Sequence, residues 1–322
     1  MPSTVRLPDL PYDAWEPTKA TLHLASQIIG KVKLARHPKQ SHWWHGTLRV
    51  TPRGIGTQTI PFPGGSFEIE LDVHDLSLRV RDSTGARDGF ELAGTSISDV
   101  YRRTMDLLDG MGHHTEILAE PYDNPHSTVP FADDHDHDSW DHDAILRWWQ
   151  SMSFVDEVFQ TFSGRSFMRT SPVQLFWHSF DIAVTRFTGR RSPSFGEGGR
   201  RSDVEAYSHE VISFGWWPGD PEVRLPAFYS YTAPEPTGLA DRPLDPAAAW
   251  WQELPASHMA MLKWDDVRTA ADPRETLLTF LESANAAGMS ALGLEGADLL
   301  DTGPLWSDLD ERFPATRGRE TR

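Results

Sequence analysis

Residues 67–73 (FEIELDV) decide the fold class, because apolar and charged side chains alternate strictly along them. A period of two is typical of a β-strand that buries one face and turns the other toward water. Residues 76–81 and 89–92 continue the pattern around a turn at residues 83–85 (STG). This part of the chain therefore predicts an antiparallel sheet with one apolar face.

Helical patterns flank the predicted strands. Residues 18–35 carry apolar side chains at the spacing of one helix face, and a second helix follows at 96–111, with Ser98 or Thr95 as its cap and Gly112 as its stop. The remaining predicted helices are 143–162 and 273–287, and further strands are expected at 42–51, 115–118, 173–187, 207–215, 227–232 and 259–264. The sequence predicts an α+β fold, an antiparallel sheet with helices packed on one side.

The order of these elements occurs twice along the chain. The tetrapeptide WWHG at 43–46 matches FWHS at 176–179, and both are followed by a Glu-bearing strand, a hairpin and a helix. We therefore expect one full-length domain, 1–322, that is internally duplicated, with pseudo-twofold halves. Its predicted parts are repeat one at 18–118, an acidic His-rich linker at 119–142, repeat two at 143–290 and a flexible tail at 310–322.

Composition limits the classes of partner. The chain has 30 basic and 47 acidic residues and a formal charge of −17, which disfavours nucleic acid and anionic membrane surfaces. No apolar run approaches the roughly 18 residues of a membrane span, and the first residues do not resemble a signal peptide, so a cytoplasmic location is expected. The chain has no cysteine, so any metal would need His and carboxylate ligands.

The first functional hypothesis is a metal-assisted enzyme acting on a small molecule between the two repeats. His45 and His178 would be equivalent ligands of Fe, Mn or Zn, with Glu68 or Glu70 and His209 or Glu210 completing the set. The competing interpretation is structural. Glu68, Glu70 and His45 fall on polar faces of predicted strands, and His178 shares its strand parity with apolar residues.

Other residues supply candidate roles in catalysis and substrate binding. His209 or Glu210 is a candidate general acid or base, although strand neighbours face opposite sides and cannot both enter one pocket. Arg186 is a candidate anion clamp in a local group of arginines. The predicted substrate-binding residues, in a cleft between the halves, are Trp44, Trp177, Arg186 and Tyr207.

The second functional hypothesis is a non-catalytic module. It would bind an aromatic or aliphatic small molecule, or a protein partner, through Trp43, Trp44, Trp177, Trp216 and Trp217. The enzyme hypothesis predicts His and Glu side chains that converge, whereas the binding hypothesis predicts a dry aromatic pocket with those groups scattered. The oligomeric state cannot be predicted from these features.

Six stretches of the chain resemble an uncharacterised bacterial family described only as a domain of unknown function. They lie at 10–35 (LPYDAWEPTKATLHLASQIIGKVKLA), 42–55, 67–81, 171–191 (SPVQLFWHSFDIAVTRFTGRR), 205–220 (EAYSHEVISFGWWPGD) and 226–236 (PAFYSYTAPEP). The resemblance implies a single full-length domain and no particular activity. It also implies that His137, Trp140 and Asp141 follow a family pattern, and that His178 is glycine in some relatives, which shifts weight toward His45, His209 and Glu210.

Overall fold

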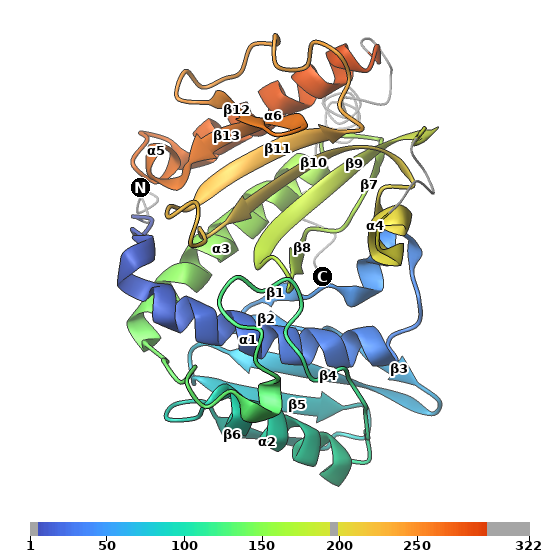
Figure 1. Ribbon diagram of the computed structural model, residues 1–322, viewed down its shortest axis with the longest axis vertical. Coiled ribbons are helices and arrows are strands. Elements are labelled where there is room, and N and C mark those ends of the chain that lie inside the picture. Colours follow the sequence, from blue (N-terminus) through green and yellow to red (C-terminus); the bar gives the residue numbers. More distant parts are fainter. Residues whose placement is uncertain (1–5, 194–198, 295–322) are drawn as a thin grey trace, which may run out of the picture.

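The computed structural model describes residues 6–193 and 199–294, which form two antiparallel sheets with helices (Figure 1). The first part of the chain contains α1 (Tyr12–Arg36), η1 (Ser41–Gly46), β1 (Arg49–Thr51), β2 (Gly54–Gly56), β3 (Ile60–Phe62), β4 (Gly65–Asp72), β5 (Ser77–Asp82), β6 (Arg87–Glu91), α2 (Ile97–Gly110) and η2 (Phe131–Asp133). The second part contains α3 (His142–Ser163), β7 (Arg169–Thr170), β8 (Gln174–Phe176), β9 (Asp181–Arg191), α4 (Arg201–Ala206), β10 (His209–Trp217), β11 (Ala227–Ala233), β12 (Trp250–Leu254), β13 (Ser257–Lys263), α5 (Trp264–Arg268) and α6 (Pro273–Ala291).

The smaller sheet is the one that the alternating sequence predicts. Its strands run in the order β1-β2-β4-β5-β6, and β3 pairs with β4. Phe67, Ile69 and Leu71 of β4 are buried, whereas Glu68 lies on the opposite face. Helices α1 and α2 lie over one face of this sheet (Figure 1). The α+β class and the antiparallel pairing are therefore confirmed.

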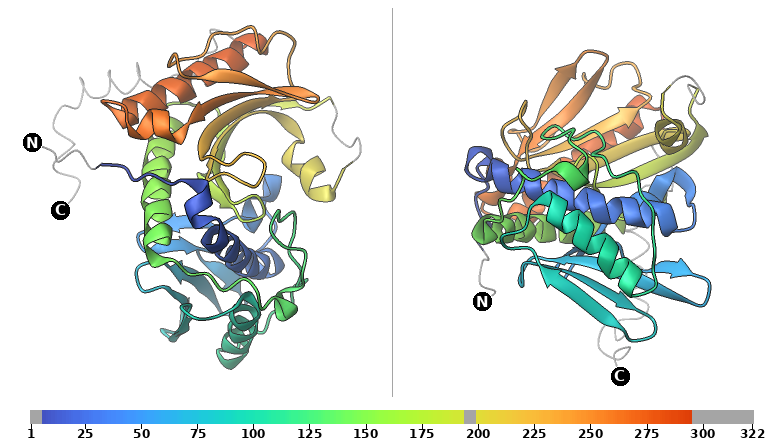
Figure 2. Two further views of the ribbon diagram at one scale, coloured as in Figure 1. Left: turned by 60° about the vertical axis from the view of Figure 1, so that its left-hand side comes forward. Right: turned by 60° about the horizontal axis from the view of Figure 1, so that its bottom comes forward.

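The larger sheet has the order β12-β13-β11-β10-β9-β7, with β8 paired to β9. One face carries buried apolar residues such as Val184, Phe214 and Phe228, and helices α3 and α6 pack on β9, β10 and β11. Neither α3 nor α6 packs on its other face, which bends around α4 in Figure 2. An isolated bridge, in which Leu48 and Leu175 exchange backbone hydrogen bonds of 2.9 and 3.0 Å, connects the two sheets.

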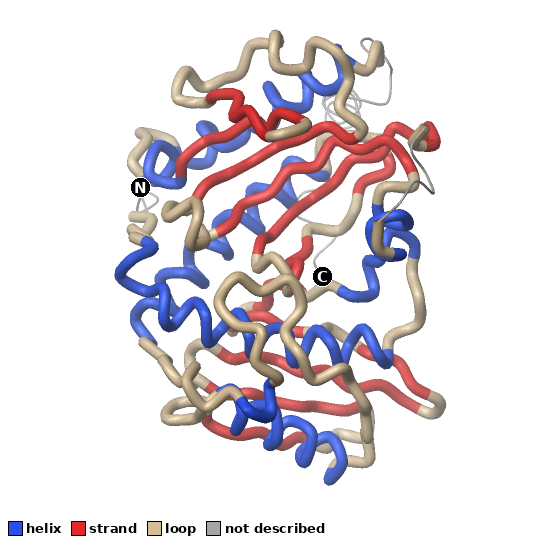
Figure 3. The backbone as a smooth tube through the Cα atoms, in the orientation of Figure 1, coloured by secondary structure: helices blue, strands red, loops and turns tan. Residues whose placement is uncertain are grey.

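Helix α1 lies between the two groups of strands (Figure 3). It begins at Tyr12, earlier than the predicted Thr18, because Pro17 is accommodated inside the helix at the loss of one backbone donor. Residues 18–33 of α1 are all buried, including Lys19, Lys31 and Lys33. A helix buried on all sides shows that α1 contacts both halves of the molecule.

Several local predictions are wrong, each for an identifiable reason. Residues 42–51 form short 3-10 turns with a kink at His42 and Trp43, followed by the short β1; these two residues have φ of 55° and 61°, outside the extended region that a strand requires. Residues 115–118 form no strand, and the edge strand β12 lies between the predicted strands at 227–232 and 259–264, where none was predicted. The cap of α2 is Ser96, which forms a capping box with Asp99.

The acidic segment expected to be a linker is packed against the fold. Asp134 is buried and accepts a hydrogen bond from the His137 ring at 2.9 Å. The indole of Trp140 donates to Thr95 O at 2.8 Å, and Asp141 caps α3 by accepting from Ala144 N. The expected pattern of His137, Trp140 and Asp141 thus lies in the segment that leads into α3. Asp141 caps this helix, and the hydrogen bonds of His137 and Trp140 hold the segment against the fold.

The internal duplication stays a prediction. The two Trp-His stretches differ in conformation, since WWHG lies in η1 whereas FWHS ends β8 and turns into β9. The tail at 310–322 lies outside the described residues. Within the described ranges, no helix is both long enough and apolar enough to cross a membrane.

Candidate functional site: an aromatic cavity

A cavity of about 1010 Å³ lies between the free face of the larger sheet and α1, η1, α4 and residues 116–123. Its aromatic lining residues are Trp43, Trp44, Tyr122, Phe176, Trp177, Phe187, Tyr207, Trp217, Tyr229 and Tyr231. Protein cavities that enclose drug-sized ligands have about this size and are mostly apolar. The dimensions and lining are those of a small-molecule site.

Strand alternation explains which side chains enter the cavity. Asp181, Ala183 and Thr185 of β9 line it, whereas the intervening Ile182 and Val184 pack in the core. In β11, Tyr229 and Tyr231 likewise line the cavity, whereas Phe228 packs in the core on the opposite face. The register pairs Thr185 with Ser213 and Ser213 with Tyr231, so these cavity-lining residues form rows across the sheet.

One wall of the cavity is Trp177, held by two contacts. Its indole N–H donates a hydrogen bond to Gly46 O, and its ring lies directly over Gly30 of α1. A methyl group at position 30 would come within 2.3 Å of the Trp177 ring, so the glycine makes this close packing possible. Trp177 therefore fixes the distance between α1 and the larger sheet.

The floor of the cavity is a hydrogen-bonded polar group. The Asp181 carboxylate, 7% exposed, accepts hydrogen bonds from the hydroxyls of Ser179 and Tyr229. The Tyr229 and Tyr231 rings stack with centroids 6.0 Å apart, and the Tyr231 and Tyr207 hydroxyls lie 2.8 Å apart. We define Asp181, Tyr207, Tyr229 and Tyr231 as the Asp–Tyr cluster.

Protonation states in this cluster follow from burial. Burial, reinforced by the nearby Asp181 charge, raises the pKa of Tyr229 well above its usual value. Burial also raises the pKa of Tyr231, with Tyr207 as the next cause. Both phenols are therefore neutral at neutral pH and act as hydrogen-bond donors.

Basic groups of the cavity lie mostly on the walls opposite the sheet. The Lys31 ammonium lies 5.7 Å from the Trp177 ring centroid and 6.0 Å from that of Tyr122, and burial lowers its pKa. Arg200 donates to Tyr122 Oη at 2.6 Å, and Arg201 pairs with Glu205 at 2.9 Å. His178 also lines the cavity, and burial lowers its pKa.

Four residues singled out from the sequence meet in this cavity, namely Trp44, Trp177, His178 and Tyr207. Trp43 and Trp217 join them, whereas Trp216 is buried in the core against Trp264. His178 belongs to the turn between β8 and β9 and not to a continuous strand, which explains why the parity expected for it does not apply.

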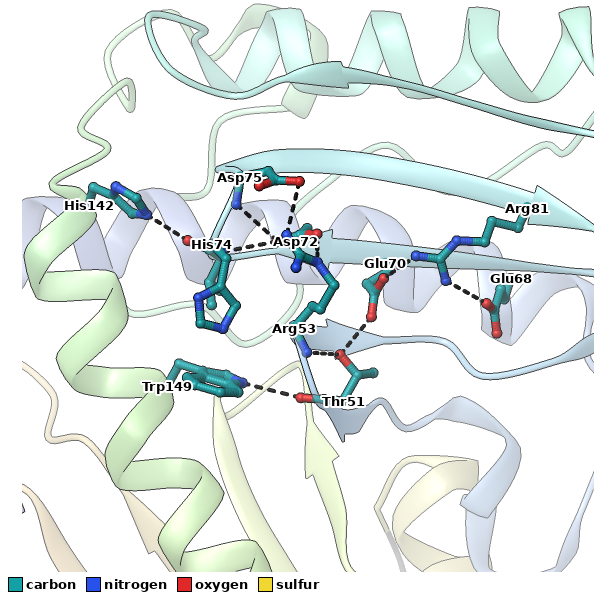
Figure 4. Close-up of polar contacts among 11 residues, drawn as sticks. Thr51, Arg53, Glu68, Glu70, Asp72, His74, Asp75, Arg81, His142 and Trp149 are labelled. Atoms are coloured by element: carbon teal, nitrogen blue, oxygen red, sulfur yellow. Dashed lines mark hydrogen bonds and ion pairs between the residues drawn. The ribbon is translucent and has the colours of Figure 1, made fainter. Parts of the chain in front are cut away.

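The proposed ligand Glu68 is not part of the cavity lining and lies on the smaller sheet, where Figure 4 shows it beside Arg81. It pairs with Arg81 at 3.0 Å, and the neighbouring Glu70 pairs with Arg81 and accepts from Thr51, both at 2.7 Å. His45 is buried in η1, where its ring stacks on Trp43 and accepts from Gln40 N. These residues are therefore each engaged in separate local contacts.

The remaining predicted site residues also lie outside the cavity lining. Glu210 accepts from Arg190 at 2.6 Å and from Thr188 at 3.0 Å, and His209 lies beside Ser208. Arg186 is on the opposite face of β9, where it donates to Phe162 O at 2.7 Å and stacks on the Phe162 ring. An anion bound in the cavity could not reach it.

The predicted metal set is not brought together. In the part of the chain that the structure describes, no group of three or more His, Asp or Glu side chains could hold a metal ion. The sequence interpretation missed Asp181, Tyr229 and Tyr231. The alternating YSY of residues 229–231 placed two tyrosines on one face and could have revealed them.

Two buried lysines give the fold a pH dependence. Lys33 donates to Thr47 O, and burial, together with the nearby Arg49, lowers its pKa from 10.5 to about 7. Burial likewise lowers the pKa of Lys19 to about 8. Because the unfolded chain keeps these protons up to the ordinary lysine pKa, unfolding takes up protons between these values, and the free energy of unfolding rises with pH there.

We therefore expect urea titrations to show a stability that rises from about pH 7 toward about pH 10, with the full penalty of the Lys33 charge present below about pH 7. Lys33→Met should reduce the slope of this rise. Lys39→Met, which removes the same charge at an exposed position, is the matched control. An unchanged slope in Lys33→Met would contradict the assignment.

Fold and cavity together define an α+β protein of two antiparallel sheets with an aromatic cavity on the free face of the larger one. Residues 7–300 match the family described as "Family of unknown function (DUF5996)", and the chain belongs to this family. The match confirms the resemblance found in the sequence. No curated protein and no solved structure matches the chain.

Proposed function

We propose that this protein binds an apolar, ring-containing small molecule in the aromatic cavity. The observation that carries the proposal is the lining of one partly open cavity, where ten Trp, Tyr and Phe side chains converge beside polar and charged groups. Large rings provide apolar contact area at little conformational cost. The expected cytoplasmic location stays part of this proposal.

The contrast with the metal-ligand candidates also favours binding over metal chemistry. His45, Glu68 and Glu210 are each engaged elsewhere, whereas the tryptophans converge. This is the arrangement that the non-catalytic hypothesis expects. The metal-assisted enzyme remains a prediction, and stoichiometric Fe, Mn or Zn that disappears in His45→Ala would support it.

A fluorescent probe tests the binding proposal. N-phenyl-1-naphthylamine is uncharged at neutral pH and emits strongly only in apolar surroundings. We expect about one probe to bind per chain, since a cavity of about 1010 Å³ encloses one molecule of this size.

Filling the cavity should abolish this binding. Ala183 of β9 lines the cavity, and Ala183→Phe would occupy the space of the probe, so the affinity should fall about tenfold or more. Ala248→Phe adds the same ring at an exposed position between β11 and β12 and should leave the affinity unchanged. The proposal fails if the wild type does not bind the probe, or if Ala183→Phe binds it equally well.

A further inference from the structure

The Asp–Tyr cluster contains a buried carboxylate, Asp181, whose nearby basic group is His178; burial lowers the pKa of His178 more than Asp181 raises it. Asp181 accepts from two neutral hydroxyls, those of Ser179 and Tyr229. Within residues 6–193 and 199–294, no Lys, Arg or His forms an ion pair with it, although nineteen other ion-pair contacts are formed. A carboxylate offers about four acceptor positions, so two remain for a partner. Burying such a charge without a counter-charge is costly.

The surroundings of Asp181 are those that a cation prefers. The stacked rings of Tyr229 and Tyr231 lie next to it, and the ring centroids of Trp217 and Tyr229 are 5.8 Å apart. Aromatic rings carry negative charge on their faces and attract organic cations. Gly215 allows this geometry, because a methyl group there would come within 2.2 Å of the Tyr229 ring.

We propose that the cavity selects ligands that carry a cationic nitrogen, and that this nitrogen binds Asp181 among the rings of Tyr229, Tyr231 and Trp217. The ligand class is then an aryl or alkyl amine, whose apolar part lies against Trp44 and Trp177. This inference rests on the proposed function and deepens it. The overall charge of −17 also favours the approach of cations.

The competing ligand chemistry is an anion held by Lys31. Its ammonium already lies over the Trp177 and Tyr122 rings, which stabilise it within the protein. Arg200 and Arg201 are likewise engaged, with Tyr122 and Glu205. Among the described carboxylates of the lining, Asp203 and Asp220 also form no ion pair, but they are exposed or half-exposed to water, whereas Asp181 is buried, and its charge therefore decides the sign of the ligand.

Three probes of similar shape and different charge test the proposal, namely phenethylamine (cationic), propylbenzene (neutral) and 3-phenylpropionate (anionic). Each is measured by displacement of N-phenyl-1-naphthylamine. We expect the amine to bind about tenfold or more tightly than either of the others, as charge-assisted hydrogen bonds provide. Asp181→Asn keeps an oxygen that accepts from Tyr229, and it should remove this preference while the neutral probe binds as before.

The matched control is Asp266→Asn, which makes the same change at an exposed residue of α5 outside the cavity lining and should keep the amine preference. Thermal unfolding of both variants shows whether they fold. Amine preference that survives in Asp181→Asn would overturn the proposal, as would preference for 3-phenylpropionate that disappears in Lys31→Met. If the neutral probe binds but no charge preference exists, only this inference fails; if nothing binds, the proposed function fails with it.

Discussion

Replacing Trp148 by alanine should lower the free energy of unfolding by about 3–5 kcal/mol, the range for deleting a buried aromatic ring. Trp148 lies on α3 and is fully buried. Its ring stacks on Phe180, in the turn before β9, with centroids 5.1 Å apart and planes 8° apart. Its ring centroid also lies 6.5 Å from that of Trp15 of α1. One side chain thus joins the two long helices to the larger sheet.

Urea denaturation of Trp148→Ala measures this effect, and Trp250→Ala is its control. Trp250 lies on the edge strand β12, where it is partly exposed, so its removal should cost far less. Because Trp148 connects both parts of the molecule, we expect one cooperative transition in the variant, shifted to lower urea. A decrease in the free energy of unfolding similar to that of Trp250→Ala would show that the cavity left by Trp148 collapses without cost. It would contradict the proposal that Trp148 connects the two long helices to the larger sheet.

The elements with clear periodicity were predictable from the sequence. Residues 67–72 of the alternating stretch lie in β4, and the predicted helices at 143–162 and 273–287 fall within α3 and α6. The exceptions depend on tertiary contacts. The left-handed φ of His42 and Trp43 cannot be read from their residue types, because only a few per cent of non-glycine residues adopt it and tryptophan favours extended structure.

The candidate site was predictable in its residue types and not in its geometry. Trp44, Trp177 and Tyr207 were expected to line a cleft, and they line the cavity. Arg186 and Asp181 show why the rest was not predictable. The turn at residues 177–180 sets which face of β9 each residue takes, and Phe180 has a φ of 60° there. This turn puts Asp181 inside the cavity and Arg186 in the core behind it.

Replacing Gly30 by alanine should destabilise the protein by about 1–3 kcal/mol, although the same change inside a helix normally stabilises by about 0.4–1 kcal/mol. The sign reverses because the new methyl group would lie 2.3 Å from Trp177 Cδ1. Trp177 cannot turn away freely, since its indole donates to Gly46 O. The ring would be pushed into the cavity, so the affinity for N-phenyl-1-naphthylamine should fall together with stability.

Two further variants separate this clash from an intrinsic effect of alanine. Gly110 of α2 has open space where its side chain would project, so Gly110→Ala should give the ordinary stabilisation. In a Trp177→Leu background the obstacle is gone, and Gly30→Ala should then stabilise as well. A double-mutant cycle thus yields a coupling energy of about 1.4–4 kcal/mol between positions 30 and 177, the difference between the loss in the wild type and the gain in the Trp177→Leu background. Additive effects would mean that α1 shifts as a whole, and that Trp177 does not set the width of the cavity.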